Sequence, residues 1–550
     1  MLFQPLPGYY RLSRGVRLVS QDESVVAVCD YPLRLVRLNA TTTHLLSLCS
    51  EERTCEQLAR ATNVPIKRVE ALCDQLRWKG LLEAGPVLSP PVWPSVSIVI
   101  PSYNRAKELE RCLRSLFALD YPTHCLEIIV VDDASTDETT TTLQHLLQEA
   151  AAHGLEMHIV HHEKRQGVGV SRNTGAGAAQ HELIAYIDSD CVASASWLRE
   201  LVPVFQDIRI AAVGGMIRAY RRVTLLGRYE DVRSSLFMGV RPQQVRLEGP
   251  LTYLPAANMV IRRAIWQQLA GFAPMTQGED VDFCRRLLMS GASMHYLPQG
   301  VVYHDYRTTP GAFLRIRVAY ASAEAPLLQR FPTGRRVLLL PPEQATFAGA
   351  LLGGAWSILW RYMRSGMKGS SPGYRGMAAR AGVGSRAGLV SRRGLAARAG
   401  VGSRAGASPA PTIHGFAAPL SLLLAVFVTL FGARKRLQKV REQRISISPL
   451  AVFKATLRGH LAYTYHLCRH LTRYYTLPLL LVSLIVPPLL PLTSMLCGVV
   501  IGVDYRRLRP DMGLGWYALC SLLDDCAYEV GVVWGCVKHK TWKPLVPHIN

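Results

Sequence analysis

The chain has 550 residues, of which 49% are hydrophobic, and a formal net charge of +23. At roughly 150 residues per domain this length suggests about three or four units, which excludes a disulfide-stapled miniprotein, and the hydrophobic content excludes a fully disordered chain. The charge is uneven, because residues 361–444 contain 16 Lys and Arg but one acid, Glu442, leaving +8 for the rest. A basic excess suits nucleic acid, an anionic membrane or a phosphorylated substrate, so its position must decide among them.

The thirteen cysteines form no C-x-x-C pair, and most lie within apolar patterns. We therefore expect buried thiols in a reducing compartment rather than a zinc site or a disulfide framework. The first residues contain no apolar run behind a basic start, so no cleaved signal peptide is expected and the chain should begin in the cytosol.

Residues 10–88 have the pattern of a small winged-helix-like α+β domain. Two β-like runs, Ser24–Asp30 and Leu33–Asn39, predict a hairpin, and three helical patterns follow. The second begins at Thr54 with capping-box spacing to Gln57. The third runs from Pro65 to Gly80 and places five apolar residues on one face. These residues are Ile66, Val69, Leu72, Cys73 and Leu76. A Pro-rich linker at residues 89–94 marks the end of this domain.

Residues 95–335 alternate strand and helix patterns. Ser97–Pro101, Glu127–Val131 and Leu183–Ile187 are continuously apolar, and an amphipathic helix is expected over Lys107–Leu119. Strands that are apolar on both faces indicate a parallel sheet covered by helices, hence an α/β domain.

The remainder of the chain changes character twice. Residues 366–410 form a low-complexity Gly/Arg insert, in which the sequence AARAGVGSRAG at 378–388 recurs at 396–406, and we expect it to be disordered. Residues 411–550 are expected to be a helical, membrane-associated region. It contains two uncharged runs, Phe416–Gly432 and the Pro-interrupted Leu477–Val503.

The membrane topology of these runs follows from their length and flanks. Seventeen residues span roughly 25 Å as a helix, which is marginal for a bilayer core of ~30 Å. Basic blocks lie on both sides of the first run, so a single crossing would leave one of them outside, against the positive-inside bias. We therefore expect this helix to lie on or re-enter the membrane, with the second run as a kinked span or re-entrant hairpin. Two buried core helices remain an alternative.

Acidic residues follow two of the predicted strands. Asp132 and Asp133 end one strand, and Asp188-Ser189-Asp190 ends another. Functional residues of parallel sheets lie beyond the carboxyl ends of the strands. Two carboxylates two residues apart in extended chain face one site, where their repulsion favours a hard cation such as Mg²⁺ or Mn²⁺ bound together with a diphosphate. A polar turn is the alternative for an isolated D-x-D. Ser135 and Glu138 have capping-box spacing for the following helix.

A third acidic cluster, Gly278-Glu279-Asp280-Val281-Asp282, opens a helical pattern. The helix dipole favours ionised carboxylates in a first turn, so Asp280 is expected to stay charged at neutral pH. Such a group can act as a general base or can simply cap the helix. His304 ends a further β-like run, Val301-Val302-Tyr303-His304, and is a candidate to complete a metal shell beside the D-x-D.

Six motifs occur in an order that resembles family 2 glycosyltransferases. They are SIVIPSYNR (97–105), EIIVVDDASTDET (127–139), SRNTG (171–175), AYIDSDC (185–191), PAANMVIRR (255–263) and GEDVDFCRR (278–286). The resemblance implies a GT-A fold, which is Rossmann-like. It also implies transfer of a hexose from a nucleotide sugar with inversion, assisted by Mn²⁺ or Mg²⁺. The expected hexose is glucose, from a donor such as UDP-glucose.

By the same resemblance, Asp280 is the catalytic base, and Asp190, Asp188 and His304 bind the metal, with Asp190 the more direct ligand than Asp188. The resemblance assigns nine residues to the nucleotide sugar. They are Pro101, Tyr103, Arg105, Asp132, Asp133, Arg172, Asp188, Glu279 and Arg286.

Residues 10–88 resemble PqqD-like peptide-chaperone domains through YRLSRGVRLV (10–19), the hairpin and RWKGLLE (77–83). Together with the catalytic motifs and the apolar tail, this arrangement resembles the glycosyltransferases of mycofactocin biosynthesis, which glycosylate a peptide-derived redox cofactor. It implies a peptide-derived acceptor presented by residues 10–88. It also implies a cell-membrane location with an anionic lipid surface as partner and the catalytic domain facing the cytoplasm.

Two other functions compete with this interpretation. A glycosyltransferase of lipid-linked glycan or polysaccharide synthesis explains the apolar tail equally well. A winged-helix protein that binds nucleic acid is disfavoured, because the candidate recognition helix mixes Lys67 and Arg68 with Glu70 and Asp74 and lacks a basic stripe.

Overall fold

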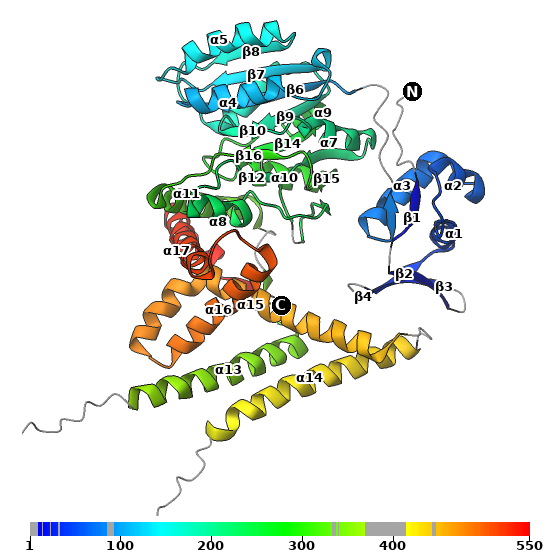
Figure 1. Cartoon of the computed structure of the whole chain (residues 1–550), viewed down its shortest axis with the longest axis vertical. Coiled ribbons are helices and arrows are strands. Elements are labelled where there is room, and N and C mark those ends of the chain that lie inside the picture. Colours follow the sequence, from blue (N-terminus) through cyan, green and yellow to red (C-terminus); the bar gives the residue numbers. More distant parts are fainter. Residues whose placement is uncertain are drawn as a thin grey trace, which may run out of the picture.

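A computed structural model describes residues 9–549 apart from 14, 22–23, 31–32, 85–92, 250, 333–336, 339, 369–413 and 443–446. The described chain comprises an N-terminal α+β unit, a central α/β unit and a C-terminal helical region (Figure 1). The linker expected at 89–94 lies mostly outside the described residues. The same holds for the Gly/Arg insert expected at 366–410, except for its first three residues, which end helix α13.

The N-terminal unit contains a three-stranded antiparallel sheet beside three helices. Strands β2 (Val16–Gln21), β3 (Ser24–Asp30) and β4 (Leu33–Leu38) pair in that order, which confirms the predicted hairpin. A second pair joins β1 (Tyr10–Leu12) to β5 (Leu82–Ala84). The helices are α1 (Ala40–Leu48), α2 (Cys55–Thr62) and α3 (Ile66–Trp78).

Local signals for two of these helices are confirmed. Thr54 and Gln57 form the capping box at the start of α2. On α3, Val69, Cys73 and Leu76 are buried as expected, but Ile66 is 36% exposed because it lies in the first turn, at the edge of the core.

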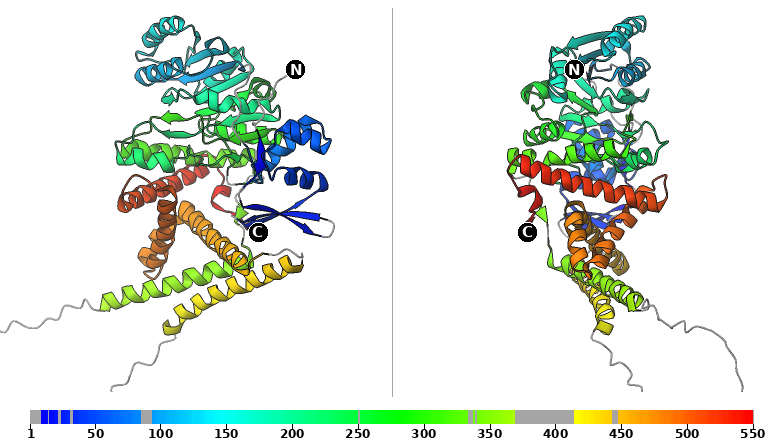
Figure 2. Two further views of the ribbon diagram at one scale, coloured as in Figure 1. Left: turned by 45° about the vertical axis from the view of Figure 1, so that its right-hand side comes forward. Right: turned by 90° about the vertical axis from the view of Figure 1, so that its left-hand side faces the viewer.

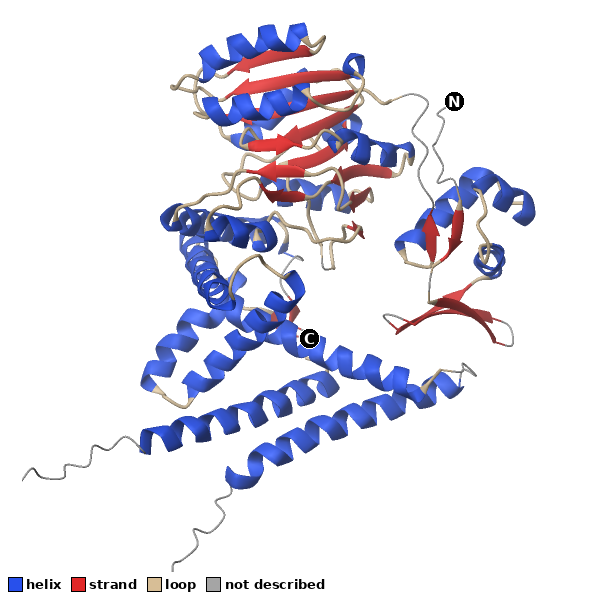
Figure 3. Cartoon of the chain, viewed as in Figure 1, coloured by secondary structure: helices blue, strands red, loops and turns tan. Residues whose placement is uncertain are grey.

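An eight-stranded sheet forms the centre of the α/β unit (Figure 3). The order of its strands is β13-β15-β11-β14-β9-β6-β7-β8. Their bounds are β6 Val96–Ser102, β7 Leu126–Asp132, β8 Glu156–His161, β9 Leu183–Ile187, β11 Ile210–Gly214, β13 Gln243–Gln244, β14 Asn258–Arg262 and β15 Ser293–Tyr296. The three predicted apolar strands, β6, β7 and β9, are adjacent and parallel.

The expectation of a parallel sheet is nevertheless wrong for one half of it. Strand β14 pairs antiparallel with both β9 and β11, so the sheet is mixed. Apolar composition indicates burial on both faces but does not set strand direction, which depends on how the chain returns to the sheet. A small second sheet joins β10 (Cys191–Ala193), β16 (Val302–His304) and β12 (Ile217–Ala219).

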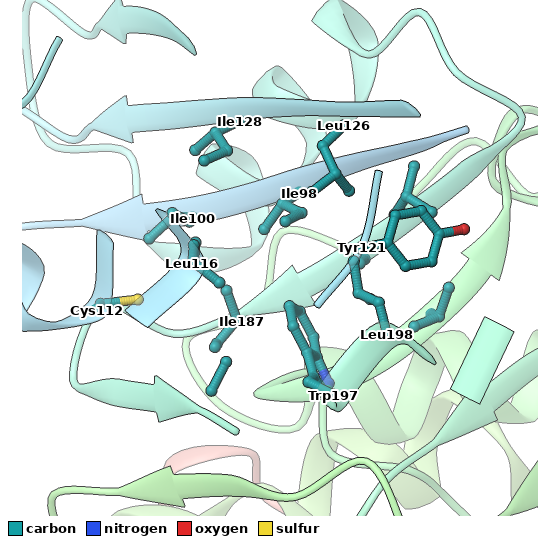
Figure 4. Close-up of a cluster of buried hydrophobic side chains, with 14 of the residues drawn as sticks. Ile98, Ile100, Cys112, Leu116, Tyr121, Leu126, Ile128, Ile187, Trp197 and Leu198 are labelled. Carbon is teal, nitrogen blue, oxygen red and sulfur yellow. The ribbon is translucent and has the colours of Figure 1, made fainter. Parts of the chain in front are cut away.

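Helices cover both faces of the central sheet and enclose two buried cores. The predicted amphipathic helix is α4 (Ala106–Phe117), which buries Leu109, Cys112, Leu113 and Leu116. Figure 4 shows Cys112 and Leu116 beside Ile98, Ile100 and Ile187 of β6 and β9. The other helices are α5 Thr139–Ala152, α6 Val168–Ala178, α7 Trp197–Leu201, α8 Leu225–Arg233, α9 Arg263–Gln268, α10 Glu279–Met289, α11 Pro310–Ser322 and α12 Glu324–Arg330.

The capping box expected between Ser135 and Glu138 does not form. Helix α5 begins at Thr139, with no side-chain cap from Glu138. The Ser135 hydroxyl instead accepts a hydrogen bond from the Asn104 backbone N–H at 2.9 Å, so it fastens the loop after β6 to the loop after β7.

The C-terminal region consists of long helices that pack beneath the α/β unit (Figure 2). They are α13 Pro342–Lys368, α14 His414–Glu442, α15 Pro449–Ile485, α16 Leu489–Leu508 and α17 Leu514–Lys538. The run Leu477–Val503 forms the end of α15 and most of α16, with the chain turning at 486–488, and α15 carries a non-helical residue at Tyr475. Strand β17 (Val337–Leu338) pairs with β18 (His548–Ile549) near the end of the chain.

Two of these helices are long and apolar enough to cross a membrane, over Ala418–Glu442 and Leu489–Leu508. The first contains the predicted apolar run Phe416–Gly432 almost entirely. Its outer surface is apolar, with Leu420, Leu423 and Phe427 each more than 60% exposed. Length and composition alone support a membrane association weakly, since buried core helices share these properties.

Helix α17 packs closely against α11 of the α/β unit. Gly531 and Gly535 face the carbonyl groups of Val318 and Ser322 so closely that a Cβ atom at either glycine would overlap them. A buried ionic network extends this contact, because Arg317 of α11 lies 2.8 Å from Glu230 of α8 and 3.2 Å from Asp524 of α17. The helical region is therefore joined to the α/β unit by a tightly packed, charged interface.

Candidate functional site

A cavity of about 700 Å³ opens at the carboxyl ends of β6, β7 and β9. Ten of the twelve residues that the sequence assigned to a site line it. They are Pro101, Tyr103, Arg105, Asp133, Arg172, Asp188, Asp190, Glu279, Asp280 and His304. The other two, Asp132 and Arg286, do not. Helices α11 and α12 and parts of the C-terminal region complete the walls.

At the end of β7, Asp133 is held in place by three donors. The backbone N–H groups of Gln166 and Gly167 each donate to it at 2.8 Å, and His162 Nδ1 lies 2.8 Å from its Oδ1. Burial alone would raise its pKa, but these hydrogen bonds outweigh burial and lower the pKa of Asp133 below its ordinary value. Asp133 is thus a fixed carboxylate at the cavity wall.

Asp132 points away from the cavity and is buried. Its carboxylate accepts from the Ser135 backbone N–H at 3.1 Å and contacts His161 Nδ1 at 3.1 Å. Because successive side chains of a strand alternate, β7 can present Asp133 to the cavity while Asp132 supports the loop.

Tyr103 offers an aromatic face to the same end of the cavity. The guanidinium of Arg165 lies 4.2 Å from the centre of its ring, and both residues line the cavity. A flat aromatic surface beside a cation suits a nucleobase and an anionic group in one ligand.

Arg172 of α6 connects the acids of β9 to those of α10. It is buried, and it donates to Asp188 Oδ1 at 2.7 Å and to Glu279 Oε1 at 2.6 Å. The guanidinium can bridge two carboxylates because its donors lie in a rigid plane. Arg172 therefore fixes the spacing between the D-x-D turn and the first turn of α10.

Asp190 has a different set of partners from Asp188. It is buried and lies 2.5 Å from Arg105, 3.5 Å from His304 Nε2 and 3.6 Å from Arg307. Burial would raise its pKa, but electrostatic interactions with His304, Arg105 and Arg307 lower the pKa of Asp190 below its ordinary value. The two acids of the D-x-D thus line one cavity but occupy separate ionic environments.

The residues around Asp190 fit a divalent cation. Ligand atoms of Asp190, Cys191 and His304 lie within 4.8 Å of one another. His304 Nδ1 is buried and has no hydrogen-bond partner among the described residues, which leaves a nitrogen lone pair or proton unsatisfied. Burial raises the pKa of the Cys191 thiol well above its ordinary value, and a protonated thiol is a poor ligand for a hard cation. Asp190 and His304 are therefore the donors that suit Mg²⁺ or Mn²⁺, and Asp188 is not part of this group.

Asp280 lies in the first turn of α10 and lines the cavity. Burial and the adjacent Glu279 carboxylate raise its pKa to about 7. The expectation that the helix dipole keeps Asp280 fully ionised at neutral pH is therefore wrong, since burial outweighs the dipole. A carboxyl group that titrates near 7 is suited to accept a proton from a substrate hydroxyl.

The third acid of this cluster, Asp282, has a structural position. It is buried and accepts from Arg286 at 2.7 Å and from Arg330 at 2.6 Å. Arg286 also donates to the carbonyl oxygens of Leu269 and Gly271, so it fastens a loop and does not reach the cavity. The structure thus places Arg286 outside the site to which the sequence assigned it.

Several cavity residues had no signal in the sequence. Arg307 follows His304 closely, but a single arginine carries no motif. Six others come from helices for which the sequence predicted no role in the site. They are Tyr320, Glu324 and Leu327 of α11 and α12, Tyr474 of α15, Tyr528 of α17 and Lys543. Only the packing of the C-terminal helices brings the last three to the cavity.

Residues 97–269 match the family described as Glycosyl transferase family 2. The Pre-mycofactocin glycosyltransferase of Mycobacterium tuberculosis is 32% identical over 275 residues, which cover 49% of this chain and 54% of that protein. The chain spans about half the length of this curated relative.

Other similar proteins are also glycosyltransferases. Glycosyltransferase AglE of Haloferax volcanii is 25% identical over 217 residues, covering 39% of this chain and 68% of that protein. A mannosyltransferase from Pyrobaculum calidifontis, solved with GDP-Man and Mn²⁺, has a TM-score of 0.35 and 22% identity, covering 43% of this chain and 65% of its own. TarS of S. aureus, solved with UDP-GlcNAc, has a TM-score of 0.33 and 21% identity, covering 41% of this chain and 65% of the TarS chain.

The match to Glycosyl transferase family 2 includes the acids at the ends of β7 and β9 but stops before Asp280 and His304. Both residues are candidates because they line the same cavity as those acids.

Proposed function

We propose that the chain transfers a hexose from a nucleotide sugar to an acceptor hydroxyl with inversion, through a GT-A type domain. One observation carries this proposal. A single cavity combines an aromatic and carboxylate end at Tyr103 and Asp133, a cation-binding pair at Asp190 and His304, and a carboxyl group with a pKa of about 7 at Asp280. These are the groups that donor binding, charge neutralisation and deprotonation of an acceptor require.

The donor would occupy the end of the cavity beyond β6 and β7. Tyr103 packs against the base, and Asp133 accepts hydrogen bonds from the base or ribose, with UDP-glucose as the donor that we propose to test. Arg105, Arg165 and Arg307 line the diphosphate region, where their charges favour an anion. Arg172 keeps Asp188 and Glu279 in position on the other side of it.

Asp190 and His304 would hold Mn²⁺ or Mg²⁺. When bound there, the ion offsets the charge that develops on a leaving diphosphate. Asp280 accepts the proton of the acceptor hydroxyl as that oxygen attacks the anomeric carbon and the bond to the diphosphate breaks. Inversion follows from this single displacement, for which no covalent intermediate is needed.

The proposed acceptor is a pre-mycofactocin type compound, presented by the N-terminal unit. The 32% identity to a pre-mycofactocin glycosyltransferase supports this acceptor. A peptide reader of PqqD-like, winged-helix type at residues 10–88 is consistent with the antiparallel sheet and the helices found there.

A second candidate is transfer to a lipid-linked acceptor at the membrane. The exposed apolar surface of α14 favours it, because two helices have the length and composition of membrane spans. In either case we propose that the protein associates with the anionic face of a cell membrane, with its catalytic domain in the cytoplasm.

Purified full-length protein incubated with UDP-glucose and Mn²⁺ tests both functions. We expect glucosylated product with pre-mycofactocin as acceptor, detected by mass spectrometry. Product on a polyprenyl phosphate alone would favour the second candidate. No nucleotide release and no product with either acceptor would contradict glycosyl transfer from this donor.

A further inference from the structure

Helices line the cavity as well as strand ends. Tyr320 of α11 and Glu324 of α12 line it, together with Tyr474, Tyr528 and Lys543 of the C-terminal region. Tyr474 belongs to α15 and Tyr528 to α17, and Figure 1 shows α17 beside α11 and α8 at the lower edge of the α/β unit. The C-terminal helices therefore form a wall of the cavity itself.

Glu324 is held firmly in this wall. The Tyr474 hydroxyl donates to Glu324 Oε1 at 2.7 Å, and the Tyr528 hydroxyl donates to the same oxygen. The other oxygen, Oε2, has no hydrogen bond to any residue in the described part of the chain. One side of the carboxylate is thus fixed by the protein while the other is available to a ligand.

The aromatic residues of this wall are themselves supported from behind. The guanidinium of Arg473 lies 3.6 Å from the centre of the Tyr528 ring, and Arg473 is anchored to Asp524 at 3.2 Å and Asp525 at 2.9 Å. The rings of Tyr474 and Tyr528 meet edge to face at 5.8 Å. Such support fixes the orientation of both hydroxyl groups.

The wall also lies close to Asp280. Helix α12 begins at Glu324, and its neighbour Ala323 packs against Gly278, the residue that precedes α10. A Cβ atom at Gly278 would lie 3.1 Å from both Ala323 Cβ and Leu327 Cδ1. Because Asp280 occupies the first turn of α10, this packing ties the position of Glu324 to that of the proposed base.

We propose that Glu324, with Tyr474 and Tyr528 of the C-terminal helices, binds the acceptor, and that the acceptor presents an uncharged, hydroxyl-bearing ring to this wall. The inference rests on the proposed glycosyl transfer. The Oε2 atom of Glu324 can accept hydrogen bonds from hydroxyl groups of the acceptor. The two tyrosine rings, which meet edge to face, add aromatic surface against which a ring of the acceptor can pack.

The test compares the full-length wild type with Glu324→Gln and Tyr528→Phe, using UDP-glucose, Mn²⁺ and pre-mycofactocin. Both substitutions keep the shape of the side chain. We expect the acceptor KM to rise about tenfold or more, as loss of a charge-assisted hydrogen bond implies. The donor KM and the slow hydrolysis of donor without acceptor should stay within about twofold. Glu110→Gln on the outer face of α4 and Tyr362→Phe, 80% exposed on α13, serve as matched controls.

Each outcome decides the proposal. An unchanged acceptor KM in both variants overturns it, as does equal loss of donor hydrolysis and transfer in folded protein, which would indicate a structural role. Wild-type product on a polyprenyl phosphate but not on pre-mycofactocin overturns the uncharged acceptor class. A wild type that neither hydrolyses nor transfers the donor overturns the proposed function and the inference together.

Discussion

Arg172 of α6 and Glu279 of α10 form a buried ion pair of 2.6 Å between residues 107 apart in sequence. The same guanidinium reaches Asp188 at 2.7 Å, so the charge of one arginine compensates two carboxylates. Breaking a buried ion pair leaves an uncompensated charge in the interior. The resulting loss in the free energy of unfolding is larger than that caused by most surface substitutions.

We therefore expect Arg172→Met to destabilise the protein by about 3–5 kcal/mol, since it leaves Asp188 and Glu279 facing each other unpaired. Urea unfolding measures the change. Arg199→Met is the matched control, because Arg199 pairs with Asp120 on the surface and should cost less than about 1 kcal/mol. Equal effects of the two substitutions would contradict the role assigned to Arg172.

Asp280→Asn should lower kcat by about 10²–10⁴-fold, the usual contribution of a general base. Donor affinity should change little, because the amide keeps the shape of the side chain and Asp280 is not assigned to the donor. Steady-state kinetics and calorimetric titration with UDP-glucose separate the two effects. A parallel loss of donor binding would indicate that Asp280 organises the site instead.

The pKa of about 7 at Asp280 predicts the pH dependence of the reaction. Transfer needs the deprotonated carboxylate, so kcat/KM should rise with pH, about tenfold per unit below 7, and level off above it. The residual rate of Asp280→Asn should lack this step. A wild-type profile without a step between pH 6 and 8 would exclude Asp280 as the titrating base.

The raised pKa of Asp280 also makes the stability of the folded protein depend on pH. Activity is expected to rise with pH, whereas stability is expected to fall. The pKa of Asp280 in the folded protein lies above its ordinary value of 3.8, so the folded state binds the extra proton between about pH 4 and 7. Its stabilising contribution is present below that range and is lost as the pH rises to about 7. The gain in Tm from Asp280→Asn should thus be larger at pH 8 than at pH 5.

His304→Gln should weaken metal-dependent donor binding, because it removes one of the two donors that suit a hard cation. We expect a 10–100-fold increase in the Mn²⁺ concentration needed for half-maximal UDP binding, of the order seen when metal sites lose a supporting group. His158→Gln on β8 is the control, since the His158 side chain is exposed and pairs with the exposed Glu156 at the surface. Binding that is insensitive to EDTA in the wild type would rule out the metal site.

Much of the site could be predicted from the sequence because several of its acidic residues come directly after strands. The acids after β7 and β9 were located by apolar runs that stop at a carboxylate, and both runs are buried strands. The capping box predicted between Ser135 and Glu138 is wrong because the Ser135 hydroxyl has a tertiary partner, Asn104, which no local pattern encodes. Apolar patterns also could not give the direction of β14, which is set by its neighbours.

The properties of single side chains were the least predictable part. The pKa of Asp280 depends on burial by helices that are distant in sequence, and Arg286 was assigned to the donor although its partners turn it away from the cavity. Tyr474 and Tyr528 had no recognisable motif. They reach the cavity only because α15 and α17 pack beneath the α/β unit, which is a property of the whole fold.

Gly531 of α17 tests whether this packing is essential. A Cβ atom there would overlap the carbonyl oxygen of Val318 on α11, and backbone atoms cannot move aside as a flexible side chain can. We therefore expect Gly531→Ala to destabilise the protein by about 1–3 kcal/mol and to reduce transfer, because α11 carries Arg317 and Tyr320 of the cavity wall. Gly515→Ala in the same helix is the control, since nothing lies within 4 Å of its Cβ position and alanine favours a helix. Thermal unfolding and transfer assays on both variants give the comparison. Equal stability and activity of the two would mean that α17 can separate from α11 without disturbing the site.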